Sequence, residues 1–430
     1  MNGKVVSGIM LTLLLTSMLA FVFSIQPAKA SGTINIRADG SIEPDSAPIS
    51  SVDNVTYTFF DNIYDEIVVE RDNIVVDGAN YTVLGAGANL YSKGINLAGR
   101  RNVTLRNMSI EGFYYGAYLD FSSSNSIFGN NMTNNEYGIR LDNSLNNSIS
   151  RNNITANNRG GVWVSHSSFN SISGNNVTAN SWDGILLIDS FYNIISENKA
   201  SNNADGIILA DSSFNSVSGN NITANNEGGI PIVCSSGNII FGNDLVANKN
   251  GILLHSSLGN FIYHNNFLSN TRQVYDVAWT HPVIPPSINS WDDGYPSGGN
   301  FWSDYEEKYP DAEEIDESGI WDTPYAIDEN NQDNYPLKEP WTLLPKTIDE
   351  MKNEIEELYS KDEIDNQGIV TGLIAKLNAA QKLIDNGKID QAKNLLNTFI
   401  NEVQAQSGKH ITPETAELLI ESAENILSNL

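Results

Sequence analysis

The chain of 430 residues has a single cysteine, Cys234, so no disulfide can form within it. Basic residues are also scarce, with 24 Lys and Arg against 52 Asp and Glu and a formal charge of −28. Because a nucleic-acid groove needs clustered Lys and Arg, this imbalance excludes a phosphate-backbone binder. Charged residues make up only 18% of the chain, so Asn, Ser, Thr and Gly must supply most of its polar surface. That composition is typical of strands and turns repeated many times.

Long apolar runs are missing except for one, from Val5 to Ile25. It follows a short, weakly positive start and precedes Ala28-Lys29-Ala30, a small-residue cleavage pattern. We therefore predict a secretory signal peptide and a protein that is secreted, held at the cell surface or placed in a periplasm-like space. An uncleaved anchor is the alternative, because the run is nearly long enough to span a bilayer. Only then do we expect a membrane partner.

The strongest pattern is a repeat with a step of 22 or 23 residues. Four columns keep this step, and they begin at Gly94, Ser122, Asn125 and Asn130. Between them, Ile, Val and Leu recur at alternate positions, as they do in strands with one buried face. Each repeat thus offers about three short strands separated by Gly, Asn and Ser corners.

A coil whose turns stack about 4.8 Å apart would join these strands into parallel sheets around an apolar interior. Corner asparagines would then form hydrogen-bonded ladders from one turn to the next. The sequence therefore predicts a mainly β protein, a right-handed parallel β-helix solenoid. A leucine-rich-repeat horseshoe has an overlapping period, but its Leu-x-x-Leu-x-Leu spacing is absent.

The repeats resemble those of the periplasmic NosD-like family, within the wider group of carbohydrate-binding and sugar-hydrolase β-helices. Two stretches that carry the resemblance are YGIRLDNSLNNSISRNNIT from Tyr137 and DGIILADSSFNSVSGNNIT from Asp205. The resemblance covers about residues 33–340 and implies the fold and, through the family name, copper delivery.

Soft copper sites use Met, Cys and His. After the predicted signal peptide, the chain keeps only Met108, Met132, Met351, one cysteine and five scattered histidines. We therefore expect the resemblance to be one of architecture, with copper handling as an alternative function.

After Asp276 the period stops and aromatic residues concentrate, which predicts a cap that closes the end of the coil. Helical periodicity follows, and LLNTFINEVQAQSGKHITPETAELLIESA resembles the small helical FIMAH module of many secreted proteins. The predicted organisation is a signal peptide at 1–30, an N-terminal capping segment at 31–66, the β-helix at 67–275, an aromatic and acidic cap at 276–340, a linker at 341–346 and a small all-α domain at 347–430. Its helices are predicted at 347–359, 367–385, 389–406 and 412–427.

Two pairs of aspartates recur 22 residues apart: Asp183 with Asp205, and Asp189 with Asp211. Carboxylates stacked about 5 Å apart raise the pKa of one of them, and this separation suits the acid and the nucleophile of a retaining glycosidase. A polysaccharide hydrolase is therefore one alternative. A lyase is another, but Arg140, Arg151 and Arg159 would lie two or three turns from the aspartates.

His166 and Cys234 fall in the same column as Asp189 and Asp211, so this column could also be a ladder of mixed metal ligands. Exposed corner positions without a function are the alternative, favoured by Asn143 in the same column.

Aromatic residues suggest where a sugar could bind. Phe169, Tyr192 and Phe214 fall in one column, and Trp182 precedes Asp183. Flat aromatic faces on a long repetitive sheet suit sugar rings, and simple packing is the alternative. An outward apolar stripe is also predicted, which we expect the cap, the helical module or a partner to cover: Trp163, Leu186, Ile208, Pro231 and Leu253.

Calcium is the one cofactor for which the sequence offers a candidate loop. Glu314, Asp316, Ser318 and Asp322 place side-chain oxygens at spaced positions around Gly319. Calcium prefers six or more oxygen ligands, and a solvated acidic turn is the alternative. Our preferred hypothesis is an exported, non-catalytic β-helix that binds glycans or cell-surface proteins and no nucleic acid.

Overall fold

A computed structural model describes residues 32–87, 91–281, 283–316, 318–341, 348–361, 363–428 and 430. The predicted signal peptide and most of the predicted linker lie outside the described residues. The chain divides into two compact units, residues 1–340 and residues 341–430.

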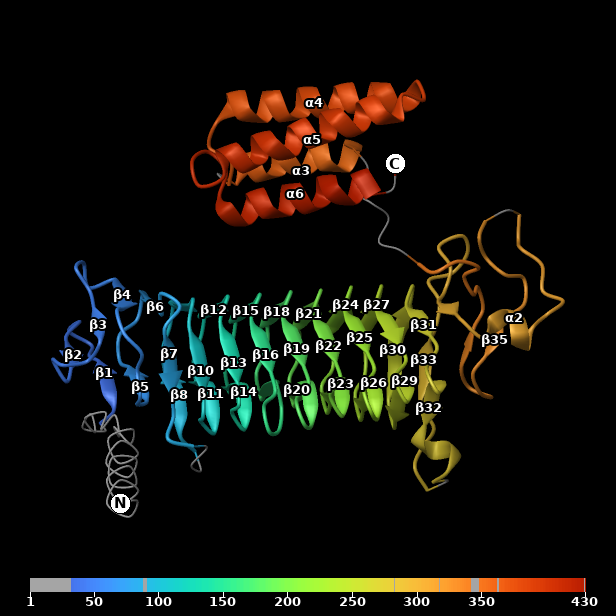
Figure 1. Ribbon diagram of the computed structural model, residues 1–430. Coiled ribbons are helices and arrows are strands. Elements are labelled where there is room, and N and C mark those ends of the chain that lie inside the picture. The colour runs from blue at the N-terminus through green and yellow to red at the C-terminus, as the bar shows by residue number, and fades with distance from the viewer. Residues whose placement is uncertain are drawn as a thin grey trace, which may run out of the picture. The chain divides into compact units, whose positions relative to one another are not determined.

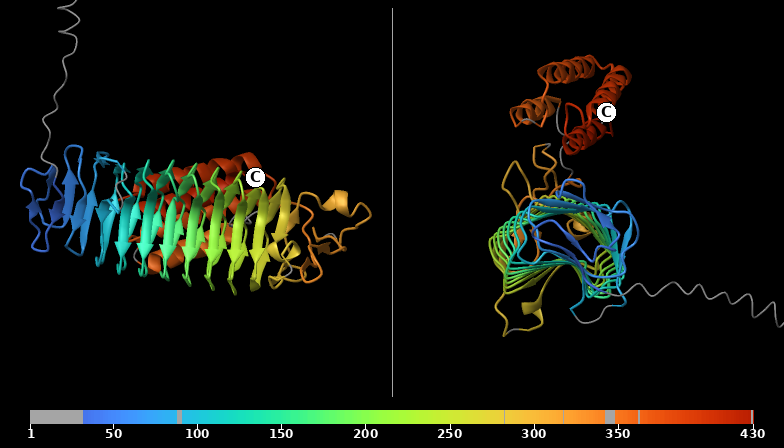
Figure 2. Two further views of the ribbon diagram at one scale, coloured as in Figure 1. Left: turned by 90° about the horizontal axis from the view of Figure 1, so that it is seen from below. Right: turned by 90° about the vertical axis from the view of Figure 1, so that its left-hand side faces the viewer.

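The first unit is a parallel β-helix in which each turn of the chain adds a strand to each of three sheets (Figures 1 and 2). Sheet A contains, in spatial order, β2 (Ile42–Glu43), β1 (Ile34–Ile36), β5 (Ile67–Val69), β8 (Lys93–Asn96), β11 (Tyr115–Asp120), β14 (Tyr137–Asp142), β17 (Val162–Ser165), β20 (Asp183–Ile188), β23 (Asp205–Ala210), β26 (Gly228–Val233), β29 (Asn250–His255) and β32 (Arg272–Asp276).

Sheets B and C run beside sheet A along the coil. Sheet B contains β3 (Ile49–Ser50), β4 (Thr56–Phe59), β6 (Ile74–Asp77), β9 (Val103–Arg106), β12 (Ser126–Phe128), β15 (Ser148–Ser150), β18 (Ser171–Ser173), β21 (Ile194–Ser196), β24 (Ser216–Ser218), β27 (Ile239–Phe241), β30 (Leu258–Tyr263) and β33 (Ile288–Ser290). Sheet C contains β34 (Phe301–Trp302), β31 (Asn266–Leu268), β28 (Asp244–Val246), β25 (Asn221–Thr223), β22 (Lys199–Ser201), β19 (Asn176–Thr178), β16 (Asn153–Thr155), β13 (Asn131–Thr133), β10 (Ser109–Glu111) and β7 (Thr82–Leu84).

The repeat explains this coil directly. Alternate apolar residues such as Ile185, Ile207 and Ile230 point inward and are fully buried, which supplies the hydrophobic stabilisation of every turn. The glycine column is needed because the turns approach each other closely: a Cβ at Gly206 would lie 2.5 Å from the carbonyl oxygen of Gly229. At the N-terminal end, β2 and β3 pair antiparallel with β1 and β4 and so end sheets A and B. The predicted parallel β-helix is confirmed.

Buried side-chain ladders join the turns at the corners. In the ladder that begins at Asn130, the backbone N–H and the side-chain amide of Asn130 both donate to Oδ1 of Asn152, at 3.0 and 3.1 Å. The ladder that begins at Asn125 follows the same rule. In the ladder that begins at Ser122, the backbone N–H donates to the hydroxyl of Ser144 at 3.1 Å, and the Ser122 hydroxyl donates to the carbonyl of Leu97 at 2.7 Å. A third asparagine ladder was missed in the sequence although it keeps the same step: Asn135, Asn157, Asn180, Asn203, Asn225, Asn248 and Asn270.

The coil continues beyond the point where the sequence period stops. β33 and β34 add another strand to sheets B and C, and Asn289 and Asn300 extend two asparagine ladders. Their steps from the preceding ladder residue are 29 and 35 residues, so the repeat hides them. The prediction that the coil ends near Asp276 is therefore corrected by one turn.

An aromatic cluster closes the C-terminal end of the interior. The ring of Trp302 stacks between Phe267 and Tyr325, with centroid distances of 4.2 and 4.1 Å, and Trp291 is fully buried beside them. The same segment contains η1 (Val277–Trp279), α2 (Tyr305–Lys308) and the small sheet of β35 (Tyr325–Ala326) and β36 (Gln332–Asp333). The predicted aromatic plug is confirmed.

The second unit is a bundle of four helices: α3 (Ile348–Ser360), α4 (Gln367–Asp385), α5 (Ile389–Gln406) and α6 (Pro413–Ser428). Their apolar faces form a core around residues such as Leu373, Phe399 and Leu419. Asn366 begins α4 by accepting a hydrogen bond from the Gly368 N–H at 2.9 Å. The predicted small helical domain is confirmed. None of the helices in the described part of the chain is long and apolar enough to cross a membrane.

Candidate functional site

The outer face of sheet A and the segments that lead into its strands carry aromatic and charged side chains that could bind a ligand. Its outward positions fall in columns because neighbouring strands pair in register, for example Tyr115 with Tyr137 and Asp183 with Asp205. One group of rings extends over five consecutive turns, and we call it the aromatic surface: Tyr91, Tyr114, Tyr115, Tyr118, Tyr137, Trp163 and Trp182.

The rings of the aromatic surface form one connected network. Tyr114 meets Tyr91, Tyr115 and Tyr137 at centroid distances of 5.6, 4.8 and 5.8 Å, and Tyr137 meets Trp163 at 4.9 Å. Tyr137 is buried below the others, whereas Tyr91 and Trp182 are 64% and 50% exposed. Buried contacts thus hold the network in place while several rings remain open to solvent.

Arg159 lies at the centre of this network. Its guanidinium is 5.0 Å from the ring centre of Trp182 and 5.7 Å from those of Tyr114 and Tyr137. It also donates hydrogen bonds to the hydroxyls of Tyr114 and Tyr137, both at 3.3 Å, and pairs with Glu136 at 3.1 Å. A planar cation held among rings in this way joins cation–π contact with fixed donors.

Arg159 was misplaced by the sequence argument, which put it two or three turns from the aspartates. The backbone N–H of Trp182 donates to the carbonyl of Arg159 at 2.9 Å, so the two residues lie on adjacent turns. Asp183 follows Trp182 directly. The separation of 23 residues between Arg159 and Trp182 equals the repeat step and could have revealed this neighbourhood.

A second arginine borders the aromatic surface. Arg140 makes a bidentate ion pair with Asp142, at 2.8 and 2.7 Å, and its guanidinium lies 4.0 Å from the ring centre of Trp163.

Burial raises the pKa of both Tyr115 and Tyr118, two tyrosines of the aromatic surface, to about 12. These phenols therefore stay protonated at neutral pH and keep their hydroxyls as hydrogen-bond donors.

Asp183 and Asp205 lie beside the aromatic surface at the start of β20 and β23. Their register places them one above the other on neighbouring strands, about 4.8 Å apart along the coil. Burial, with the charge of Asp205 as a second cause, raises the pKa of Asp183 to about 6. Burial also raises the pKa of Asp205 to about 6, although a hydrogen bond from the Gly228 N–H opposes it. The pair can therefore hold or release a proton slightly below neutral pH.

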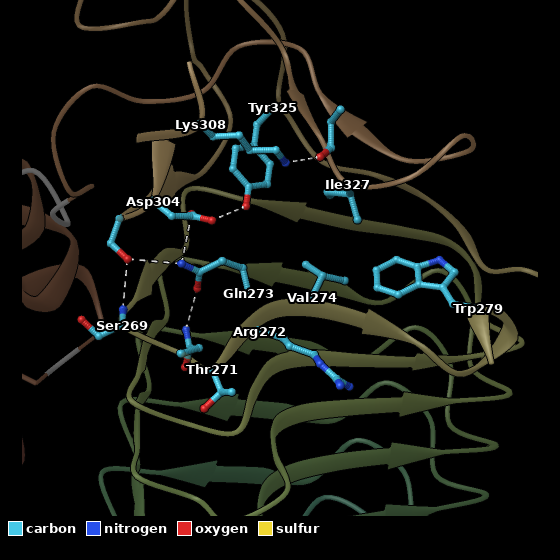
Figure 3. Close-up of a pocket in the computed structure, with 13 residues that line it drawn as sticks. Ser269, Thr271, Arg272, Gln273, Val274, Trp279, Asp304, Lys308, Tyr325 and Ile327 are labelled. Atoms are coloured by element: carbon cyan, nitrogen blue, oxygen red, sulfur yellow. Dashed lines mark hydrogen bonds between the residues drawn. The ribbon is translucent and has the colours of Figure 1, made fainter. Parts of the chain in front are cut away.

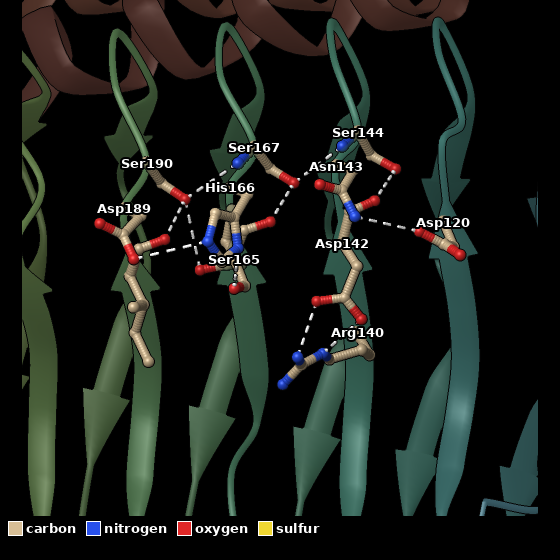
Figure 4. A network of polar contacts seen from close by, with 12 residues as sticks. Asp120, Arg140, Asp142, Asn143, Ser144, Ser165, His166, Ser167, Asp189 and Ser190 are labelled. Atoms are coloured by element: carbon tan, nitrogen blue, oxygen red, sulfur yellow. Dashed lines mark hydrogen bonds and ion pairs between the residues drawn. The ribbon is translucent and has the colours of Figure 1, made fainter.

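Asp189 and Asp211 form a separate group at a corner of the coil, where Figure 4 shows Asp189 beside His166. They follow the ends of β20 and β23, so about 20 Å of strand separates them from Asp183 and Asp205. Asp189 lies 3.6 Å from Nε2 of His166, and both side chains are about half exposed, at 49% and 62%. The four aspartates therefore form two pairs and not one cluster.

The aromatic ladder of Phe169, Tyr192 and Phe214 also lies at a corner. Its rings stack at centroid distances of 5.2 and 5.4 Å and are within 11° of parallel. Stacking covers the faces between neighbouring rings, while the three residues remain 57%, 51% and 55% exposed. Sugar C–H groups pack against the electron-rich face of a ring, so this geometry favours packing. A glycan contact at the ladder stays a prediction.

The apolar stripe follows the predicted register, with Trp163, Leu186 and Ile208 on consecutive strands. Pro231 is buried, while Leu253 is partly buried like the others. What covers the stripe stays a prediction.

The predicted calcium loop uses its oxygens within the protein. Glu314 pairs with Lys338 and accepts from the Gly319 N–H at 2.8 Å. The Ser318 hydroxyl donates to the Ile315 carbonyl, and Asp322 accepts from the Glu313 N–H at 3.1 Å. Calcium at this loop stays a prediction.

The family model of NosD, described as periplasmic copper-binding protein, matches residues 35–183 and 156–307, which is more than half of the chain. The chain belongs to the NosD family. The FIMAH domain model matches residues 348–428 of this NosD family member, which agrees with its four-helix bundle. No curated protein matches it.

Several solved structures are similar to this NosD family member. DFA-IIIase from Arthrobacter chlorophenolicus A6 without its lid shares 18% identity over 53% of this chain and 64% of its own, less than two thirds, with a TM-score of 0.40. A double mutant of the periplasmic alginate epimerase AlgG shares 16% identity over 60% of this chain and 82% of its own, with a TM-score of 0.45. The A-module of the mannuronan C-5 epimerase AlgE4 of Azotobacter vinelandii shares 13% identity over 60% of this chain and 75% of its own, with a TM-score of 0.39. Similarities of this size identify neither an activity nor a substrate.

Copper, which the family description implies, needs soft ligands that converge. Met108 and Met132 are buried in the apolar interior of the coil, and Met351 is buried in the core of the helical bundle. Cys234 is exposed, and within the described ranges no three His, Cys, Asp or Glu side chains group to hold a metal ion. The residues of the described chain therefore do not fit a copper centre.

Proposed function

We propose that this NosD family member is an exported glycan-binding protein that holds a polysaccharide against the outer face of sheet A without cleaving it. The observation that carries the proposal is the aromatic surface with Arg159 at its centre.

The aromatic surface has the chemistry that sugar rings require. Exposed faces of Tyr91 and Trp182 offer apolar contact, and the tyrosine hydroxyls and the guanidinium of Arg159 offer hydrogen bonds. The surface extends over four steps of the coil, about 20 Å at the spacing between strands. A length of several sugar units can therefore lie along it, as expected for a polymer and not for a single small molecule.

Isothermal titration with a panel of neutral and acidic polysaccharides tests this proposal. We expect one class to bind, and we expect the double variant Tyr114→Ala/Trp182→Ala to weaken that binding at least about tenfold, since two stacking contacts are lost. The matched control is Phe169→Ala on the aromatic ladder, which should leave the affinity unchanged. Unchanged affinity in the double variant, or equal loss in the control, would contradict the proposal.

A polysaccharide hydrolase is the second candidate, because Asp183 and Asp205 have pKa values of about 6 and lie next to the aromatic surface. The spacing between strands is close to the separation of about 5–5.5 Å that retaining glycosidases use. Assays for new reducing ends between pH 5 and 7 separate the two candidates. Product release that is lost in Asp183→Asn and Asp205→Asn but kept in Asp189→Ala and Asp211→Ala would replace the non-catalytic proposal with the hydrolase.

A further inference from the structure

A cavity of about 400 Å³ lies where the last strand of sheet A meets the cap (Figure 3). Its size falls within the range of small-molecule sites. We call it the cap pocket, and its lining combines residues from β32, η1, α2, the N-cap of α2 and β35: chiefly Arg272, Gln273, Trp279, Asp304, Lys308 and Tyr325. No motif in the sequence pointed to it.

Two cations line the cap pocket, Arg272 and Lys308. Within the described part of the chain, neither pairs with a carboxylate. Lys308 donates one hydrogen bond to the carbonyl of Ala326 at 2.6 Å, which leaves two of its N–H groups for another acceptor. In a protein with a formal charge of −28, two unpaired cations at one cavity are unusual and favour an anionic ligand.

The acidic group in this lining is engaged by its neighbours. Asp304 accepts hydrogen bonds from the side-chain amide of Gln273 at 3.1 Å and from the hydroxyl of Tyr325 at 2.9 Å. Its role is therefore to hold two walls of the pocket. The ammonium group of Lys308 also lies 3.9 Å from the ring centre of Tyr325, so Tyr325 helps to orient the cation.

An aromatic ring completes the pocket. Trp279 is 45% exposed, and its indole N–H is fixed by Asp328 at 3.1 Å. Tyr275 meets Trp279 edge-on at 5.8 Å and also lies 4.8 Å from the guanidinium of Arg272. One tyrosine thus positions both the exposed ring and the cation before any ligand arrives, which lowers the cost of binding.

We propose that the cap pocket binds two neighbouring carboxylate-bearing sugar residues of an acidic polysaccharide. Figure 3 shows the charged ends of Arg272 and Lys308 on opposite sides of the pocket, so each cation holds the carboxylate of a different sugar residue through charge-assisted hydrogen bonds. The sugar ring packs against Trp279, and the hydroxyls around Thr271 and Ser303 meet those of the sugar. This proposal is independent of glycan binding at the aromatic surface, which lies four strands away in sheet A.

Titration of the full chain with three small probes tests the proposal: digalacturonate, the neutral disaccharide cellobiose and inorganic phosphate. None is long enough to reach both the cap pocket and the aromatic surface. We expect digalacturonate to bind at least about tenfold more tightly than cellobiose or phosphate. Arg272→Gln and Lys308→Gln should each weaken the binding of digalacturonate about tenfold, whereas Lys199→Gln on sheet C should leave this affinity unchanged.

Two further variants keep the test specific. Trp279→Ala should weaken the binding of digalacturonate but not that of phosphate. Trp182→Ala on the aromatic surface should leave digalacturonate binding unchanged. Equal binding of digalacturonate and cellobiose would overturn the proposal, as would insensitivity to both cation variants. Phosphate that binds as tightly as digalacturonate would show a general anion site and overturn the sugar assignment. A midpoint temperature of thermal unfolding equal to that of the wild type confirms that each variant is folded.

Discussion

Sheets A and C share one buried frame but have very different outer faces. On sheet C the outward positions hold small polar side chains, such as Asn153 and Thr155 on β16. On sheet A they hold Tyr115, Tyr137 and Asp183. The inward residues of both sheets are Ile, Val and Leu packed in the same core. Because the inward residues maintain the coil, the outward residues of sheet A are free to serve a ligand.

The two faces also differ in how their polar groups are satisfied. On sheet C, the outward asparagines bond to one another: Asn153 donates to Asn131 at 2.8 Å and Asn176 to Asn153 at 2.7 Å. On sheet A, exposed rings and aspartates with raised pKa values occur side by side. A column whose side chains hydrogen-bond to one another has a structural role. A column whose rings and carboxyl groups remain exposed to solvent is suited to binding a ligand.

The largest expected effect concerns the frame that the two sheets share. Asn203→Ala, at the corner between β22 and β23, removes an amide that donates to the carbonyl of Val177 at 3.1 Å and accepts from the Asn180 N–H at 2.9 Å. Several buried groups lose their partners, so the free energy of unfolding should fall by about 3–5 kcal/mol. Denaturant titration measures this.

The matched control is the neighbouring Asn202→Ala. Asn202 is exposed, and its column already accepts Ala156 and Ala179 at positive φ. We expect a loss of less than about 1 kcal/mol. Similar losses in both variants would mean that the ladder adds no special stability to the frame.

Most of the frame could be predicted because the coil converts a fixed sequence step into a spatial contact. Once the step of 22 or 23 residues is known, Asp183 must lie beside Asp205 and Asn130 beside Asn152, as the structure confirms. The same rule would have placed Arg159 beside Trp182 and revealed the third asparagine ladder, had it been applied to every column.

The cap pocket could not be predicted in this way. Its walls come from residues 269–279, 303–308 and 325–327, which are joined by loops of irregular length. No step relates them, and their neighbourhood depends on how the aromatic cluster around Trp302 packs. The aromatic surface was missed for another reason: its rings occupy several columns, so no single column shows them.

The next prediction compares one aspartate on each sheet. A carboxyl group with a raised pKa keeps its proton to higher pH when folded than when unfolded, so the contribution of Asp183 to the free energy of unfolding is greatest below about pH 4 and falls until about pH 6. Asp183→Asn should therefore raise the free energy of unfolding at pH 7.5 by up to about 3 kcal/mol and remove part of this pH dependence. Thermal unfolding between pH 4 and 8 measures both.

The control is Asp244→Asn on sheet C, where Asp244 already accepts a hydrogen bond from Asn266 at 2.7 Å. We expect no stabilisation there. Asn250, in the column of Asp183, indicates that sheet A accepts an amide at this position. If both variants stabilised the protein equally, the difference between the two faces would lie in net charge alone.

A smaller effect is expected from a reciprocal exchange of cations. Arg159→Lys keeps the charge but loses the planar fork that contacts three rings, so polysaccharide affinity should fall about fivefold. Lys199→Arg, the opposite change on sheet C, should leave affinity unchanged. Titration with the polysaccharide that the wild type binds measures both, and equal effects would remove the distinction between the faces.

The smallest effect should come from the corner that follows sheet A. His166→Ala removes an ion pair with Asp189 in which both side chains are about half exposed, so stability should change by no more than about 0.5 kcal/mol between pH 5 and 8. Polysaccharide affinity should not change either, because the corner lies about 20 Å along the strand from Asp183. If affinity did fall in His166→Ala while Trp182→Ala retained it, the binding site would have to be moved from the outer face of sheet A to its corner. The predicted column of His166, Asp189, Asp211 and Cys234 would then become the functional feature of the coil.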